Sequence, residues 1–248
     1  MPQQKPTLPF YKRILSPIIS PILIRLGYKK LIKENKTRSN NLTPEFIIDF
    51  MFSKQEGLGG LIIPWQEKTE FLNLLKIVDK QKPACVLEIG TANGGTLFSF
   101  CRLAKDDATV ISIDLPHGKF GRGYPSWKIP VYESFAKKGQ TIHLLREDSH
   151  SPLTLEKAKK LLAGKKVDFL FIDADHTYEG VKQDFLQYRE LVSENGIIAF
   201  HDIAHNPNPV YGVEKLWHEI KNDYKYTELI QDKNQGGYGI GVLEMNKK

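Results

Sequence analysis

From Thr43 onward the sequence alternates between short apolar runs and longer segments whose apolar residues recur at helical spacing. Nearly continuous apolar runs of this kind are typical of strands buried on both faces of a parallel sheet. Intervening segments of roughly 10–15 residues are typical of crossover helices. The pattern predicts an α/β fold, in which helices cover both faces of a mostly parallel sheet. The predicted strands are 84–89, 109–113, 141–145, 167–172 and 196–200, and the predicted helices are 44–52, 65–78, 96–104, 131–138, 153–162, 178–191 and 213–222.

Two further strands are predicted near the C-terminus, at 226–230 and 240–243. Only Gln231 to Gly239 separates them, and a parallel crossover needs about a dozen residues or more. These two strands are therefore expected to form an antiparallel hairpin at the end of the sheet.

The positive charge of the chain is concentrated in its first 40 residues. Nine lysines and arginines stand there against Glu34 alone, a net charge of +8, so the remaining residues carry −2 of the formal +6. A body without net positive charge gives no support for nucleic-acid binding. Hydrophobic residues make up 41% of the chain, which excludes wholesale disorder. Two cysteines, Cys85 and Cys101, exclude a disulfide scaffold and indicate a reducing, cytoplasmic location.

The stretch Ile14 to Leu26 is the most apolar in the chain. It is shorter than the roughly 20 residues that span a bilayer. Pro17 and Pro21 are expected to interrupt it, so that a short helix begins at Pro21 and leads into the basic run 28–38. We expect residues 1–42 to form an arm and residues 43–248 to form the catalytic domain. Two partners suit residues 1–40: an anionic membrane surface, or the body or a second copy of this chain.

Polar residues follow the first two predicted strands. The first strand leads through Glu88 into a turn rich in small residues, with Gly90, Thr91 and Gly94, ahead of a helix N-terminus. This spacing differs from the dinucleotide-binding pattern G-x-G-x-x-G, so a nucleotide-dependent oxidoreductase is disfavoured. The second strand ends at Asp114, which is suitably placed to accept hydrogen bonds from ribose hydroxyls.

A denser polar cluster follows the fourth and fifth predicted strands. The fourth ends in Asp173-Ala174-Asp175-His176, and the fifth leads into His201-Asp202. Neighbouring strands lie about 4.8 Å apart. If these two strands are neighbours, Asp173, His201 and Asp202 converge on one position that suits a cation.

Taken in order, these motifs resemble those of the class I S-adenosylmethionine-dependent methyltransferases, from about residue 84 to 243. V-L-E-I-G-T-A-N-G-G-T resembles their first motif, and the C-terminal hairpin resembles their reversed last strand. The resemblance implies a Rossmann-like, seven-stranded, mostly parallel sheet with an antiparallel last strand, preceded here by the helical arm. It also implies S-adenosylmethionine as cofactor. The implied cofactor-binding residues are Glu88, Gly90, Thr91, Gly94, Asp114, Asp148, Ser149 and Asp173.

Within that fold, F-I-D-A-D-H-T-Y-E-G-V followed by G-I-I-A-F-H-D is similar to a subgroup that contains metal-dependent macrolide sugar O-methyltransferases and cephalosporin-hydroxylase-like proteins. This resemblance implies that Asp173, His201 and Asp202 hold a divalent cation, Mg²⁺ or Mn²⁺, and that His176 is the general base. His201 departs from the acidic residue of the subgroup. Because imidazole suits Mn²⁺, Fe²⁺ or Zn²⁺ better than Mg²⁺, the metal differs, His201 does not bind it, or no metal is used.

The resemblance implies O-methylation of a hydroxyl on a small molecule or sugar. The long loop 115–130 is expected to close over the substrate through Arg122, Tyr124 and Trp127, and Lys119 and Arg122 suggest an anionic group there. Residues 206–211 are expected to form the opposite wall. Two other functions remain open: a metal hydrolase built from Asp173, His176, His201 and Asp202, and a non-catalytic partner subunit that binds the cofactor.

Overall fold

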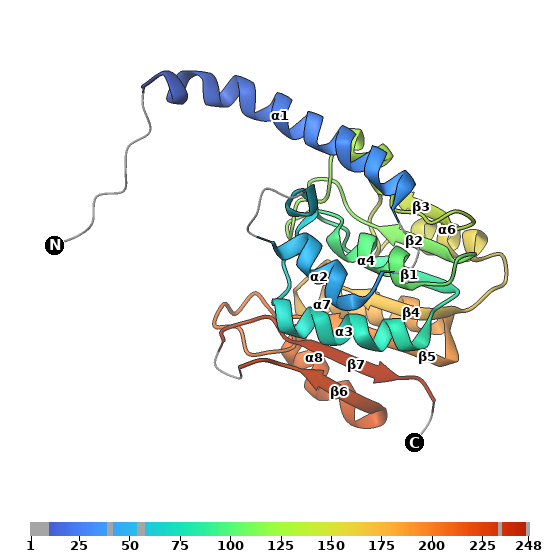
Figure 1. Ribbon diagram of the computed structural model, residues 1–248. Coiled ribbons are helices and arrows are strands. Elements are labelled where there is room, and N and C mark those ends of the chain that lie inside the picture. The colour runs from blue at the N-terminus through green and yellow to red at the C-terminus, as the bar shows by residue number, and fades with distance from the viewer. Residues whose placement is uncertain (1–9, 39–41, 54–57, 233–234, 247–248) are drawn as a thin grey trace.

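A computed structural model describes residues 10–38, 42–53, 58–232 and 235–246. The body is a single seven-stranded sheet with the order β3-β2-β1-β4-β5-β7-β6 (Figure 1). Its strands are β1 (Cys85–Ile89), β2 (Thr109–Ile113), β3 (Thr141–Leu145), β4 (Val167–Ile172), β5 (Val192–His201), β6 (Lys225–Leu229) and β7 (Ile240–Glu244). The first five are parallel, and β7 pairs antiparallel with both β5 and β6. The predicted fold class and C-terminal hairpin are confirmed.

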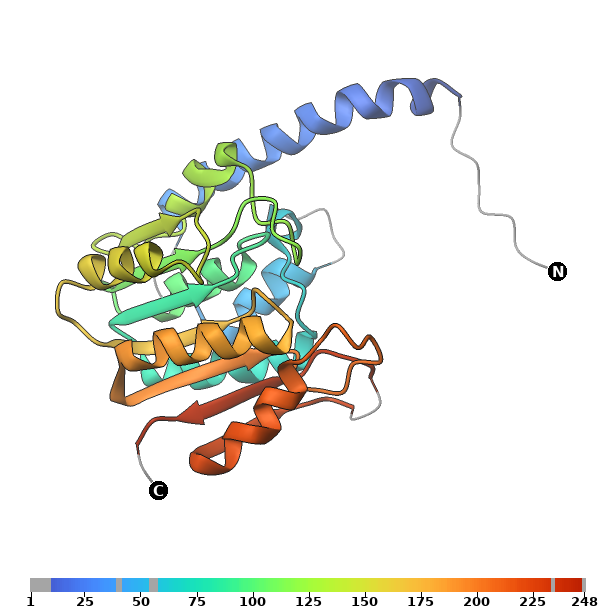
Figure 2. The same ribbon diagram turned by 180° about the vertical axis from the view of Figure 1, so that it is seen from behind.

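Helices cover both faces of the sheet, as predicted. One face packs against α2 (Pro44–Phe52), α3 (Lys68–Gln81) and α4 (Gly95–Leu103), around a cluster of phenylalanines. The other packs against α6 (Pro152–Leu162), α7 (Tyr178–Tyr188) and α8 (Val213–Ile220), which Figure 2 shows from behind. A short helix, α5 (Ile129–Glu133), follows the loop after β2. Short 3₁₀ turns lie at 58–62, 126–128, 189–191 and 221–223.

The boundaries of several elements differ from the predicted ones for local reasons. The helix predicted from residue 65 begins at Lys68, because the Glu67 side chain accepts hydrogen bonds from the backbone N–H groups of Thr69 and Glu70. Strand β5 begins four residues earlier than predicted, and a register shift in its pairing with β4 accommodates the polar residues 193–195. Helix α5 ends five residues early, in a turn in which Lys137 N–H donates to the side chain of Gln140.

The N-terminal arm differs most from its prediction. It is one helix, α1 (Phe10–Thr37), that passes through both Pro17 and Pro21. Each proline removes one backbone hydrogen bond without forbidding helical φ. Figures 1 and 2 both show the N-terminal half of α1 running beyond the body. The other half is anchored, because Tyr28 and Leu31 are buried and Tyr28 donates to the carbonyl of Leu61 at 2.8 Å. None of the helices in the described ranges is long and apolar enough to cross a membrane.

Candidate active site

Two cavities lie side by side at the edge where the parallel strands end. The smaller, which we call the β2 cavity, has a volume of about 250 Å³ and is lined by Asp114, Asp148 and Ser149 among others. The larger, the β5 cavity, has a volume of about 360 Å³ and is lined by residues that follow β1, β4 and β5. Phe120 and Ala174 line both, so a ligand in one cavity reaches the boundary of the other.

The turn after β1 forms the wall between β1 and the two cavities. Gly90 has φ of +100°, and a Cβ atom there would lie 1.9 Å from the carbonyl oxygen of Asp173. Gly94 has φ of +86°, and a Cβ atom would lie 2.6 Å from the ring of Tyr132. Both positions therefore require glycine. The backbone N–H groups of Thr91 and Ala92 donate to Oδ2 of Asp114, at 3.1 and 2.7 Å, and fix the turn against the end of β2.

Among the described residues, neither Asp114 nor Glu88 on the β2 side forms an ion pair with a lysine or arginine. Asp114 is buried, and its burial raises its pKa to about 6 although backbone N–H groups donate to it. Glu88 lies deeper, fully buried, and lines neither cavity. Ser112 Oγ donates to it at 2.6 Å, and burial raises the pKa of Glu88 to about 8. Glu88 thus lies beneath the turn after β1, whereas Asp114 lines the β2 cavity.

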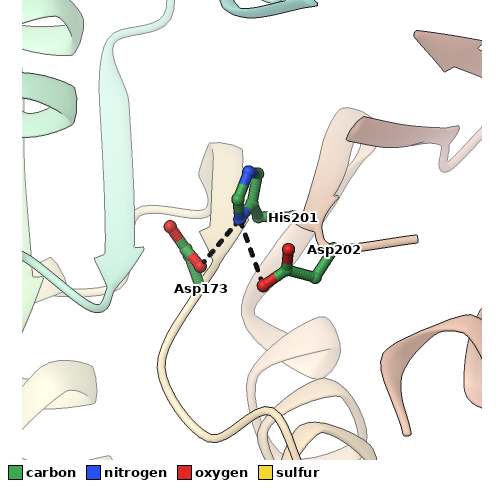
Figure 3. A group of neighbouring side chains, drawn as sticks. All are labelled: Asp173, His201 and Asp202. Atoms are coloured by element: carbon green, nitrogen blue, oxygen red, sulfur yellow. Dashed lines mark ion pairs between the residues drawn. The ribbon is translucent and has the colours of Figure 1, made fainter. Parts of the chain in front are cut away.

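The acids of the β5 side are paired with histidines. Figure 3 shows His201 between Asp173 and Asp202: its Nδ1 lies 3.3 Å from Asp173 Oδ1 and 3.4 Å from Asp202 Oδ2. His176 approaches the same two oxygens, with Nε2 3.4 Å from Asp173 and Nδ1 3.3 Å from Asp202. The predicted neighbours β4 and β5 bring these four side chains together, since the tips of paired strands meet.

Ion pairing overrides burial in this cluster. Burial alone raises the pKa of Asp173 and Asp202, but the positive charges of His201 and His176 lower both pKa values. Burial alone lowers the pKa of the two histidines, and the two carboxylates raise it for His176 and raise it well above the ordinary value for His201. The two carboxylates therefore favour the protonated, imidazolium form of both histidines.

Comparisons with known proteins agree with this geometry. A family model described as a methyltransferase domain matches residues 87–203, just under half of the chain, from β1 to just past β5. A rhamnosyl O-methyltransferase of Mycobacterium tuberculosis is 22% identical over 184 residues, which cover 68% of this chain and 69% of that protein. An uncharacterized protein of Sinorhizobium fredii, y4gI, is 28% identical over 150 residues, 58% of this chain, but the chain spans only 16% of its length.

Two solved structures share the fold. One is TomG from Streptomyces achromogenes, an O-methyltransferase of tomaymycin synthesis solved with S-adenosylmethionine; its TM-score is 0.51 at 16% identity, over 69% of this chain and 78% of that one. The other is CalS11, a TDP-rhamnose 3′-O-methyltransferase of calicheamicin biosynthesis, with a TM-score of 0.52 at 16% identity, over 89% and 93%. The strand order and reversed β7 complete the match. The chain therefore has the fold of the class I S-adenosylmethionine-dependent methyltransferases.

The donor set of the β5 cavity suits a divalent cation. One ligand atom from each of Asp173, His201 and Asp202 lies within 4.8 Å of the others. Within the described ranges, His201 Nε2 and His176 Nδ1 are buried without a hydrogen-bond partner. Two carboxylate oxygens and one imidazole nitrogen favour Mn²⁺, Fe²⁺ or Zn²⁺ over Mg²⁺. A divalent cation also supplies the same charge as the two imidazolium protons.

Two supports of this cluster were missed from the sequence. Gln66 Nε2 donates to Asp173 Oδ2 at 2.6 Å, and Gln66 lines the β5 cavity because α3 begins only at Lys68. The backbone N–H of Tyr238 donates to Asp202 Oδ1 at 3.1 Å. The sequence offered one signal for Gln66: a glutamate at position 67 can cap a helix, which would leave Gln66 in the loop before that helix. No comparable signal predicts that the β6–β7 loop reaches Asp202.

The three predicted substrate residues of the loop 115–130 lie away from both cavities. Arg122 is exposed, Tyr124 is buried against Tyr132, and Trp127 packs on Tyr28 of α1 with ring centroids 5.2 Å apart. The loop folds back on the arm and α5, so these side chains stabilise the loop. Its residues that reach the β5 cavity are instead Phe120 and Gly121, and Asn206 and Tyr211 form the expected opposite wall.

Proposed function

We propose that this methyltransferase transfers a methyl group from S-adenosylmethionine to a hydroxyl of a sugar. The observation that carries the proposal is the juxtaposition of the two cavities, with an acid suited to ribose on one side of Phe120 and an acid–histidine cluster on the other. Two proteins similar to this chain are named for methylation of rhamnose. One is similar to it in sequence and the other in fold. That shared sugar supports a sugar acceptor.

The β2 cavity is the proposed site of the adenosine half of the cofactor. Asp114 offers a carboxylate to ribose hydroxyls, and Asp148 and Ser149 line the same cavity beside the position of the adenine ring. Gly90, Thr91 and Gly94 form the turn toward the β5 cavity, where Asp173 is close enough to contact the methionine half. When bound, S-adenosylmethionine supplies an electrophilic methyl group on a sulfonium.

The residues of the β5 cavity orient the acceptor and remove its proton. Attack on a sulfonium methyl requires an in-line oxygen, so orientation contributes much of the rate. His176 is the proposed base, because an imidazole has a pKa near neutral pH. Its ring is fixed by stacking on Phe120, with centroids 4.7 Å apart. His176 can accept a proton only while its ring is neutral. In the proposal the ring is neutral when another positive charge, in place of a proton on His176, balances Asp173 and Asp202.

Asp173, His201 and Asp202 would hold a divalent cation, which would balance the charge of the two carboxylates. Such a cation, when bound, lowers the pKa of a coordinated hydroxyl and polarises it. The side chains of this cluster therefore serve two roles in the proposal, holding the cation and releasing His176 to act as a base. We place Mn²⁺ ahead of Mg²⁺ because of the imidazole of His201.

The test is a His176→Ala variant of the full chain. Turnover is expected to fall about 10²–10⁴-fold, the usual contribution of a general base, while calorimetry shows unchanged affinity for S-adenosylmethionine. His205→Ala is the matched control, since His205 lies in the neighbouring loop, is exposed and pairs with Glu214. Near-normal turnover in His176→Ala contradicts the base. Absence of S-adenosylmethionine binding in the wild type contradicts the proposed function itself.

A further inference from the structure

The rim of the β5 cavity carries aromatic side chains that are open to solvent. Trp65 is 58% exposed and Tyr238 is 45% exposed, and both line the cavity. Phe120 and Tyr211 line it as well, with their ring centroids 5.7 Å apart. Exposed aromatic rings that are spread over a surface cannot all contact one ligand. Rings gathered around one cavity can do so, and they indicate a ligand with apolar faces. The ring C–H groups of a sugar, or an apolar group attached to it, provide such faces.

The described lining of the same cavity offers no lysine or arginine side chain for a phosphate. Its two histidines face Asp173 and Asp202 at ion-pair distances. A diphosphate is bound in proteins by arginine, lysine or convergent N–H donors. Lys119 lines the β2 cavity instead, and Arg122 lines neither. The anionic group expected from the basic loop 115–130 therefore has no partner in the acceptor site.

We infer that the acceptor is a neutral glycoside with an apolar aglycone, and that it binds in preference to a nucleoside diphosphate sugar. The inference rests on the proposed function and specifies its substrate. The sugar hydroxyls meet the polar cluster of Asp173, His176 and Asp202 at the base of the cavity. The apolar aglycone packs at the rim, against Trp65 and Tyr238.

This choice places the methylation in a reaction sequence. A nucleoside diphosphate sugar loses its nucleotide when a glycosyltransferase joins the sugar to an aglycone. If only the neutral glycoside fits the β5 cavity, the glycosyl transfer must come first, and this methyltransferase acts on its product. An enzyme that instead methylates the nucleotide sugar acts before that transfer.

Binding measurements separate the two substrates. We would titrate the full chain, saturated with S-adenosylhomocysteine and Mn²⁺, with phenyl rhamnoside and with TDP-rhamnose, and follow heat by calorimetry. Phenyl rhamnoside is expected to bind at least about 10-fold more tightly, and TDP alone is expected not to displace it. Tighter binding of TDP-rhamnose, displacement by TDP, or failure of both sugars to bind overturns the inference. Binding of S-adenosylmethionine in a separate titration reports on the proposed function independently.

Variants of the rim test the part played by the aromatic side chains. Trp65→Ala is expected to weaken phenyl rhamnoside binding about 5- to 10-fold, and Trp65→Phe to retain most of it, because stacking needs a ring rather than an indole N–H. Phe46→Ala is the matched control, since Phe46 is 47% exposed on α2 and lines neither cavity. Unchanged binding in Trp65→Ala together with Tyr238→Ala removes the rim from recognition and overturns the inference.

Discussion

The two cavities at the sheet edge treat the same kind of side chain in opposite ways. In the β2 cavity, burial raises the pKa of Asp114 to about 6, and its donors are backbone N–H groups. In the β5 cavity, Asp173 is equally withdrawn from water, yet the charges of His201 and His176 hold its pKa below the ordinary value. Burial is common to both sites, so the difference lies in the partner groups.

This contrast assigns a different ligand to each cavity. A carboxylate whose donors are backbone N–H groups, with no lysine or arginine paired to it, suits neutral donors such as ribose hydroxyls. In the β5 cavity, Asp173 and Asp202 are paired with two histidines. A metal cation that binds there would take the place of the positive charge that protons on the histidines supply. In the proposed function, two sets of acids on one edge of the sheet therefore divide the methyl transfer: one set binds the donor and the other activates the acceptor.

The largest expected effect is that of Asp173→Asn. The change removes one charge from the β5 cluster and leaves His201 with a single carboxylate partner. We expect turnover to fall about 10²–10⁴-fold, as for loss of an acid–base or cation site. Affinity for S-adenosylmethionine is expected to fall by less than turnover does, because Asp173 is proposed to contact only the methionine half of the cofactor. Asp107→Asn, in an exposed turn, is the control. Equal losses of turnover and cofactor affinity would show that the two cavities are not separate in function.

Asp114→Asn is the reciprocal change in the β2 cavity. The amide keeps one acceptor oxygen but loses the charge, and hydrogen bonds to charged groups contribute about 1.5–3 kcal/mol. Affinity for S-adenosylmethionine is therefore expected to fall roughly 10- to 100-fold. Turnover at saturating cofactor is expected to stay within about threefold of wild type, as measured by steady-state kinetics at several cofactor concentrations. A loss confined to turnover would contradict the ribose-binding role.

The sequence predicted the sheet better than the site. Strands and helices leave a periodic pattern of apolar residues in the sequence, whereas contacts between distant side chains leave no such pattern. Strands 109–113, 141–145 and 167–172 agree with the structure to the residue, since each is a short, mainly apolar run bounded by polar residues. The convergence of Asp173, His201 and Asp202 followed from one topological assumption, that β4 and β5 are neighbours.

The loops could not be predicted in this way. The loop 115–130 has the length and composition of a substrate lid, but Trp127 packs on α1, about 100 residues earlier in the chain. No local pattern encodes that contact. The prediction for α1 was wrong because a local rule, that prolines end helices, was applied too strictly. The helix continues through Pro17 and Pro21 and tolerates the loss of two hydrogen bonds.

A smaller effect is expected on stability from Glu88→Gln, beneath the β2 cavity. The pKa of Glu88 is raised by burial to about 8, above its ordinary value of 4.5, so the folded protein keeps this proton at pH values where the unfolded chain releases it. The group therefore costs stability increasingly as pH rises from about 4.5 to 8. Glutamine cannot ionise, so the variant is expected to gain on the order of a few kcal/mol over wild type at pH 8 and little at pH 4.5. Urea unfolding at both values measures the gain, and a pH-independent difference would contradict a buried neutral Glu88.

The smallest effect is expected from Gln66→Ala, because Gln66 acts on the β5 cavity through Asp173. Its Nε2 donates to Oδ2 of Asp173, the oxygen that faces neither histidine. Removing one such bond to a charged acceptor frees the carboxylate to rotate without changing its charge. We expect turnover to fall about 10-fold and cofactor affinity to stay constant. Gln66→Glu sharpens the comparison, since it places a second negative charge against Asp173 at the same position. If the cluster is limited by charge, Gln66→Glu will be the worse variant and added Mn²⁺ will restore part of its turnover. If the cluster is limited by geometry alone, both variants will lose the same activity and Mn²⁺ will restore neither.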